Sequence, residues 1–180
     1  MRRRRRSWIV LTLPLLLLTA CSPPDEPVVA LAVRDGQPVG VLVPCGGSFG
    51  QLGVHVNHDD QGDQANRPPL ITWDVQGRLT SEVVEVTLLG QPPEGWEVAD
   101  AVDLTAAEAG MDVDVEPLTE LRPGVTYTVS GSAGRDSIPV DFTLADLSWI
   151  GPDQVLAPRG RDATTVVSRK AFLRKARGSC

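Results

Sequence analysis

The sequence predicts an all-β fold, an antiparallel sandwich of about seven to eight strands that ends in a short basic helix. From about residue 28 to residue 144, apolar side chains recur at every second position, and Gly, Pro and Asp separate these runs. No long helical pattern lies between most of the runs, which disfavours a parallel α/β sheet. The chain has 180 residues, of which 42% are hydrophobic and 22% charged, so its composition excludes a collagenous or wholly disordered protein.

Eight candidate strands follow from this alternation. In chain order, their alternating apolar positions are Val29, Leu31 and Val33; Val39, Val41 and Val43; Leu52, Val54 and Val56; Ile71, Trp73 and Val75; Val84, Val86 and Leu88; Met111, Val113 and Val115; Val125, Tyr127 and Val129; and Ile138, Val140, Phe142 and Leu144. Asp35 and Gly36, between the first two, are typical of a two-residue hairpin turn. Residues 101–109 predict a short helix in a connection. A body of this size buries a two-layer core unaided, so we expect no metal and no cofactor.

Residues 1–20 have the layout of a secretory signal peptide. Residues 2–6 are all Arg, and an apolar stretch follows from Trp8 to Leu18. A transmembrane helix is the weaker alternative, because spanning takes about 20 apolar residues and Pro14 interrupts the run.

The next residues carry a lipidation motif. Leu18-Thr19-Ala20-Cys21 resembles the lipobox of bacterial lipoproteins. The resemblance implies cleavage before Cys21, a diacylglyceryl thioether on its sulfur, and a cell-membrane protein that faces the extracytoplasmic side. Residues 21–27 then form the lipidated cysteine and a Pro-rich spacer. Ordinary secretion, with cleavage after Ala20, stays open as an alternative.

A second motif bears on the fold. Leu121, Pro123, Gly124 and Tyr127 form a pattern that resembles the tyrosine corner of immunoglobulin-like and fibronectin type III sandwiches. The resemblance implies an Ig-like sandwich in which the Tyr hydroxyl bonds to upstream backbone, with Trp73 as a core residue. Position 129 is Val where antibody domains have Cys, so strand order stays open, as does an unrelated sandwich or barrel.

Two patterns could support chemistry, and the first is Gly46-Gly47-Ser48-Phe49-Gly50, which matches the G-x-S-x-G nucleophile elbow. An elbow turns from a strand into a helix, whereas residues 51–56 alternate like a strand. A flexible glycine loop around Ser48 is therefore favoured.

The second pattern gathers His55, His58, Asp59, Asp60 and Asp63. Residues three apart on a strand point to opposite faces, so the two histidines share a metal only if His58 has left the strand. The acidic run lacks the spacing of a calcium hand. We expect a solvated polar loop, with a weak calcium loop as the alternative.

Two cysteines remain once Cys21 is lipidated. Cys45 and Cys180 form an even pair in a compartment where disulfides persist, which favours a bond between them. Two separate thiols are the alternative.

Charge divides the mature chain into a sandwich domain, residues 28–158, and a basic tail, residues 159–180. Residues 22–158 carry a net charge of -17 and the tail carries +6. The acidic body lacks the basic footprint that nucleic acid requires, so no nucleic-acid partner is expected. Ser168 predicts the N-cap of a helix over residues 169–177, with Val167 and Phe172 as a hydrophobic staple. We expect the tail to dock on the domain; a free tail attracted to anionic lipid is the alternative.

Together these features predict a membrane-anchored extracytoplasmic lipoprotein that acts as a non-catalytic binding or structural module of the cell envelope. Its expected partners are the membrane, through the Cys21 lipid, and an envelope protein or polymer. The alternative is an envelope hydrolase or metal-dependent accessory that uses Ser48 or the His55/His58 loop. With its β-rich body and the runs at residues 140–147 and 155–158, the chain also resembles lipoproteins of actinomycetes. That resemblance implies no activity.

Overall fold

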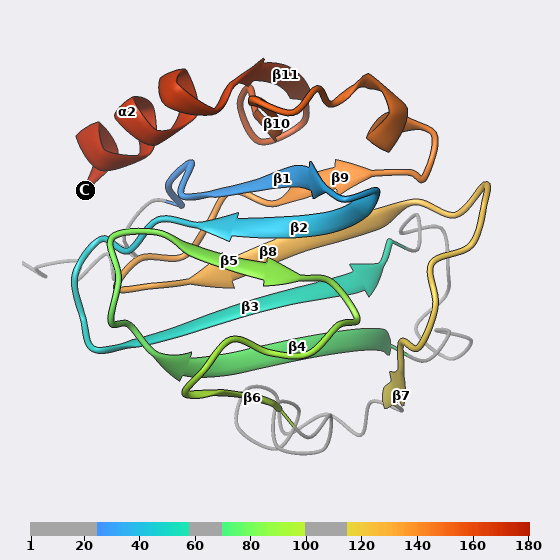
Figure 1. Cartoon of the computed structure of the whole chain (residues 1–180), viewed down its shortest axis with the longest axis horizontal. Coiled ribbons are helices and arrows are strands. Elements are labelled where there is room, and N and C mark those ends of the chain that lie inside the picture. Colours follow the sequence, from blue (N-terminus) through green and yellow to red (C-terminus); the bar gives the residue numbers. More distant parts are fainter. Residues whose placement is uncertain (1–24, 58–69, 100–114) are drawn as a thin grey trace, which may run out of the picture.

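The computed structural model describes residues 25–57, 70–99 and 115–180, which form an all-β sandwich with one C-terminal helix (Figure 1). The first sheet has the order β11-β10-β1-β2-β5, and the second has the order β6-β4-β3-β8-β9, with β7 beside β4. Neighbouring strands pair antiparallel, except that β4 and β7 are parallel. The all-β sandwich is therefore confirmed.

The elements of the first sheet are β1 (Val29–Arg34), β2 (Gln37–Leu42), β5 (Val84–Thr87), β10 (Gln154–Pro158) and β11 (Thr164–Ser168). Those of the second are β3 (Phe49–Val56), β4 (Leu70–Arg78), β6 (Trp96–Val98), β7 (Val115–Pro117), β8 (Tyr127–Ser132) and β9 (Val140–Phe142). A 3-10 turn, η2 (Asp146–Trp149), precedes β10, and α2 (Arg169–Ser179) ends the chain.

The turn between β1 and β2 explains their register. Asp35 and Gly36 both have positive φ, 50° and 77°, which the two central residues of a type I′ turn require. Arg34 then pairs with Gln37, and the six residues of β1 face the six of β2. The hairpin expected at this position is confirmed.

The main core lies between the two sheets. Alternate residues of each strand point inward, so the period-two pattern of the sequence becomes one buried layer. Its fully buried members include Val29, Leu31, Leu42, Leu52, Val54, Val75, Val86, Val129, Val140 and Phe142. Burying each such side chain contributes about 1.5–3 kcal/mol.

A second apolar layer covers the outer face of the first sheet. In this layer α2 places Phe172 and Ala176, with exposed fractions of 2% and 0%, against the sheet. The sheet residues that it covers are Ala30, Ala32, Val39, Val41, Val43, Val155 and Ala157. The prediction of strands with one buried face is therefore wrong for β1 and β2, which are buried on both faces, as is β10.

The basic tail is part of the sandwich. Residues 164–168 form β11, which pairs along its length with β10, so the expected boundary at residue 158 falls within a hairpin. Figure 1 shows β10, β11 and α2 together at one side of the molecule. The strands β6, β10 and β11 were not among the expected eight. The helix expected at residues 101–109 lies outside the described residues, as do Met111 and Val113.

The sequence pattern at residues 121–129 forms a tyrosine corner. The carbonyl of Arg122 accepts a hydrogen bond from the Val125 N–H, which closes a turn with Pro123 and Gly124 at its centre. Gly124 has φ 78°, as the third position of a type II turn requires. The Tyr127 hydroxyl then accepts a hydrogen bond from the Arg122 N–H at 2.7 Å, while its ring is 1% exposed. The hydroxyl thus ties β8 to the chain that precedes it.

Replacing Tyr127 by Phe keeps the buried ring but leaves the Arg122 N–H without its acceptor. We expect Tyr127→Phe to lower the free energy of unfolding by about 1–3 kcal/mol, measured by denaturant unfolding. An unfolding curve that overlays that of the parent would show that the corner bond contributes nothing to stability.

Candidate functional site

The outer face of the second sheet is polar where β3, β4 and β8 lie side by side. Strand register brings alternate residues of the three strands into rows on this face. The rows are Ser132, Gln51 and Gln76; then Ser130, Gly53 and Asp74; then Thr128, His55 and Thr72. Each of these residues alternates with a core residue, so the same pattern that builds the core also builds this face.

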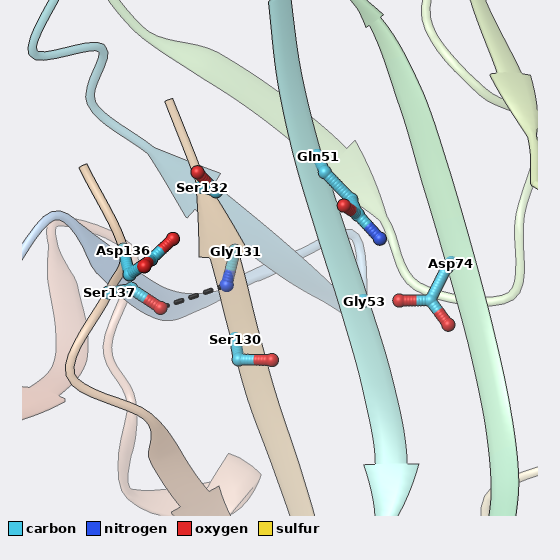
Figure 2. Close-up of a pocket in the computed structure, with 8 residues that line it drawn as sticks. All are labelled: Gln51, Gly53, Asp74, Ser130, Gly131, Ser132, Asp136 and Ser137. Carbon is cyan, nitrogen blue, oxygen red and sulfur yellow. Dashed lines mark hydrogen bonds between the residues drawn. The ribbon is translucent and has the colours of Figure 1, made fainter. Parts of the chain in front are cut away.

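A hollow lies on this face, with a cavity volume of about 230 Å³. Figure 2 shows its lining, in which the Asp74 carboxylate points from β4 toward β3 at Gly53. The residues that line it are Gln51, Gly53, Asp74, Ser130, Gly131, Ser132, Asp136 and Ser137. We call this set the polar hollow. It offers amide, hydroxyl and carboxylate groups, which suit a ligand rich in hydrogen-bonding groups.

Gly53 makes room for the carboxylate at the centre of the hollow. A Cβ atom at this position would lie 1.8 Å from Asp74 Oδ1, far inside contact distance. The absent side chain is therefore what allows Asp74 to lie over the neighbouring strand.

Several groups act on the Asp74 carboxyl. Burial raises its pKa above the ordinary value for Asp, because the charged form loses hydration. A hydrogen bond from Thr72 Oγ1 to Oδ2 at 2.6 Å, the nearby His55 and a hydrogen bond from Gln51 all lower the pKa and oppose this effect. The carboxyl is thus held in place by its neighbours on the same face.

The opposite wall of the hollow is built by β8 and the loop that follows it. Ser137 Oγ accepts a hydrogen bond from the Gly131 N–H at 2.8 Å, and the Ser137 N–H donates to the Gly131 carbonyl at 2.9 Å. Because Ser137 Oγ accepts in this contact, its own proton can be donated to a ligand. The Glu26 N–H donates to the Asp136 carbonyl, which places the start of the described chain behind this wall.

The two candidates for a catalytic pair do not meet. Ser48 directly precedes β3, and His55 lies near the other end of the same strand, so about 23 Å of extended chain separates them. The residues after Ser48 form a strand and not a helix, so the loop lacks the geometry of a nucleophile elbow. His58, Asp59, Asp60 and Asp63 lie outside the described residues. Within the part of the chain that the structure describes, no group of His, Cys, Asp and Glu could hold a metal ion.

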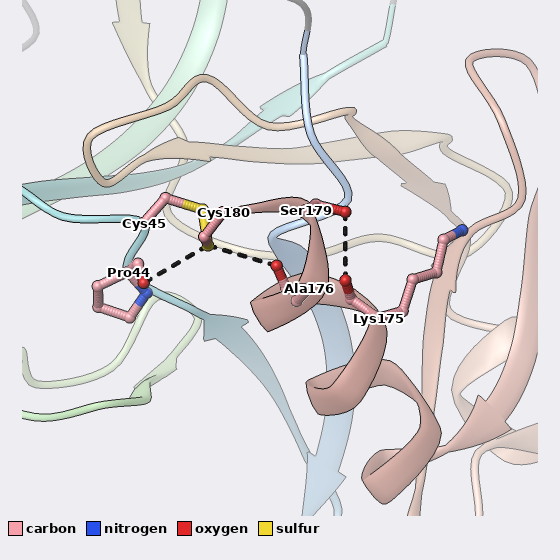
Figure 3. Close-up of a disulfide and its surroundings, with 6 residues drawn as sticks. All are labelled: Pro44, Cys45, Lys175, Ala176, Ser179 and Cys180. Atoms are coloured by element: carbon pink, nitrogen blue, oxygen red, sulfur yellow. Dashed lines mark hydrogen bonds between the residues drawn. A yellow bond between two sulfur atoms is a disulfide. The ribbon is translucent and has the colours of Figure 1, made fainter.

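Cys45 and Cys180 form a disulfide, which links the loop after β2 to the end of α2 (Figure 3). Their Cα atoms are 4.8 Å apart, and 135 positions separate them in the sequence. The Cys180 sulfur also lies 3.3 Å from the Ala176 carbonyl oxygen and 3.8 Å from that of Pro44. A disulfide sulfur carries no proton, so these are close contacts and not donated hydrogen bonds.

The helix is further held by its N-cap and by ion pairs. Ser168 Oγ accepts a hydrogen bond from the Ala171 N–H, the capping interaction expected from the sequence. Arg169 pairs with Glu85, and Arg177 pairs with Glu82 at 2.8 Å. The acidic partners lie on or beside β5, so the basic tail and the acidic body do meet through discrete contacts.

Cys21, the candidate lipidation site, lies outside the described residues. Among the described residues, no helix is both long enough and apolar enough to cross a membrane. No family model, curated protein or solved structure matches the chain.

The polar hollow was not predicted from the sequence. The alternation of Thr72, Asp74 and Gln76 with core residues indicates a polar face on one strand, as does the alternation of Thr128 and Ser130 on another. Which of these side chains meet depends on strand register, and the glycine opposite Asp74 is the one signal of a close approach that the sequence holds.

Because Gly53 accommodates the Asp74 carboxylate, we expect Gly53→Ala to lower the free energy of unfolding by about 1–3 kcal/mol. The loss should be much smaller when Asp74 is also replaced by Ala, because the clashing oxygen is then gone. Denaturant unfolding of both single variants and the double variant measures this coupling.

Gly178→Ala is the matched control, since a Cβ at this helical position meets no atom within 4 Å. It should cost no stability. An equal cost of Gly53→Ala with and without Asp74 would contradict the role given to the carboxylate.

Proposed function

We propose that the chain is a lipoprotein, anchored in the cell membrane through acyl chains on Cys21, whose sandwich acts outside the cytoplasm as a non-catalytic binding or structural module of the envelope. The lipobox at residues 18–21, directly after a signal-peptide pattern, carries this proposal. Two acyl chains on one cysteine give stable anchoring, whereas one chain holds a protein only marginally.

The disulfide supports an extracytoplasmic location. Structural disulfides persist in oxidising compartments and are rare in the cytosol. With Cys45 and Cys180 bonded to each other, Cys21 is the one cysteine left for lipidation.

The polar hollow is the contact site that we propose for an envelope protein or polymer. Its side chains can donate and accept hydrogen bonds, and Phe49 lies on the same face two residues before Gln51, with its side chain 53% exposed. An exposed aromatic ring beside converging polar groups suits a ligand that has both apolar and hydrogen-bonding surfaces. The alternative of an enzyme gains no support from Ser48 and His55, which lie at opposite ends of β3.

The three cysteines provide a test of the anchor with a built-in control. We expect Cys21→Ser to release the protein from the membrane fraction or to leave its precursor uncleaved, because the thioether cannot form. Cys180→Ser should stay in the membrane fraction. Membrane fractionation shows where each variant is located, and mass spectrometry of the N-terminal peptide shows whether Cys21 is modified. An unmodified Cys21 in the mature chain would establish ordinary secretion instead.

The binding role is tested in the same cells by photo-crosslinking. A photo-crosslinking amino acid replaces Gln51, inside the polar hollow, or Arg122, an exposed control position on the corner turn. An adduct specific to position 51 supports the proposal. Identical adducts at both positions, or adducts at neither, would count against the hollow as the contact site.

A further inference from the structure

The outward face of α2 consists of basic residues and glycine. Lys170 and Arg174 are exposed on the side opposite the buried Phe172 and Ala176, and Lys175 is exposed at the flank of the helix. None of the three basic side chains forms an ion pair or a hydrogen bond with any residue that the structure describes. Arg169 and Arg177 differ, because each is paired with a glutamate. We call Lys170, Arg174 and Lys175 the basic face of α2.

The described chain begins beside this helix. The Val28 carbonyl accepts a hydrogen bond from the Val43 N–H at 2.9 Å, and Cys45, two residues further on, is bonded to Cys180. Figure 3 shows the start of the described chain, in blue, passing beside Ser179 at the end of α2. Asp25 pairs with Arg161 of the β10–β11 loop at 3.3 Å. The N-terminal segment and the C-terminal end of α2 therefore lie at the same end of the molecule.

The tether between the anchor and the folded body is short. Four peptide units join Cys21 to Asp25, and a fully extended chain of this length spans at most about 14 Å. The 11 residues of α2 are about 16 Å long. An anchor at Cys21 therefore holds this end of the sandwich, with α2, close to the bilayer.

Charge decides which surface faces the lipid. Residues 22–158 carry -17 and residues 159–180 carry +6. An anionic membrane repels the acidic body and attracts basic side chains that lie within a Debye length of about 8–10 Å. The orientation of lowest electrostatic energy thus turns α2 toward the headgroups.

We propose that the basic face of α2 lies against anionic phospholipid headgroups of the membrane in which Cys21 is anchored. This inference rests on the proposed anchor and adds an orientation to it. Because α2 covers the outer face of the first sheet and the polar hollow lies on the outer face of the second, this orientation turns the sheet face that carries the hollow away from the headgroups that α2 contacts. The wall of the hollow at Asp136, which Glu26 contacts, stays near the tether.

The chain has two lysines, Lys170 and Lys175, and both lie on the proposed membrane-facing surface. The mature protein, as its own cells produce it, is reconstituted in vesicles of phosphatidylcholine alone or mixed with phosphatidylglycerol, and vesicle-bound protein is recovered by flotation. An amine-acylating reagent is then applied, and the two lysines are quantified by mass spectrometry. We expect acylation to be several-fold slower in the anionic vesicles at low ionic strength, and high salt should remove the difference.

Arg78, exposed at the end of β4 in the second sheet, is the internal control for orientation. Its modification by a dicarbonyl reagent should be equal in the two kinds of vesicle. Arg174→Gln should weaken the protection of the lysines, and Arg78→Gln should not.

The outcomes separate this inference from the anchor. Protein that does not float with either vesicle overturns the anchor, and this inference with it. Protein that floats but shows equal lysine acylation in both vesicles overturns the orientation alone. Protection of Arg78 with reactive lysines would show that the opposite face meets the membrane.

Discussion

The first sheet is stable only with both of its faces covered, and the covering of its outer face by α2 is the constraint on which the rest of the structure depends. Without the helix, the apolar side chains of β1, β2 and β10 that face outward would lie in water. Phe172 and Ala176 fill this layer, and the small side chains of Ala30 and Ala32 let the helix approach the sheet. Burial of Phe172 alone contributes about 1.5–3 kcal/mol.

The disulfide and the apolar contacts outweigh the ion pairs in holding this helix. Exposed pairs such as Arg177 with Glu82 contribute about 0–1 kcal/mol each. A disulfide that closes a separation of 135 residues contributes about 5 kcal/mol in the chain-entropy model. Arg169 adds a constraint, since its Nε atom is buried without a hydrogen-bond partner among the described residues while its Nη2 atom pairs with Glu85. Loss of Glu85 would leave this charge poorly compensated.

Local patterns in the sequence were sufficient to predict those elements whose structure depends on neighbouring residues alone. The hairpin at Asp35 and Gly36 and the cap at Ser168 follow from turn and capping preferences alone. The alternation of apolar and polar residues did not predict β10, because a strand that is buried on both faces has apolar residues at successive positions. Residues 155–157 of β10 form a continuous apolar run without alternation, and the change of charge at residue 159 suggested a boundary within what is a hairpin.

The polar hollow could not be predicted because it depends on contacts between distant residues. Asp74, Ser130 and Gly53 belong to three strands, and each alone indicates only a polar or small position in a strand. Register places them in one row. Gly53 then becomes a site of close approach, and the sequence alone does not reveal that Asp74 is the residue that approaches it.

Whether the disulfide holds α2 on the sheet can be measured directly. Hydrogen exchange and denaturant unfolding are compared between the parent and the double variant Cys45→Ala/Cys180→Ala, in which no free thiol remains at either site. We expect the free energy of unfolding to fall by about 2–5 kcal/mol, and the amides of α2 to lose protection before those of β3 and β8. Unchanged protection of α2, with an unfolding curve that overlays that of the parent, would contradict this expectation.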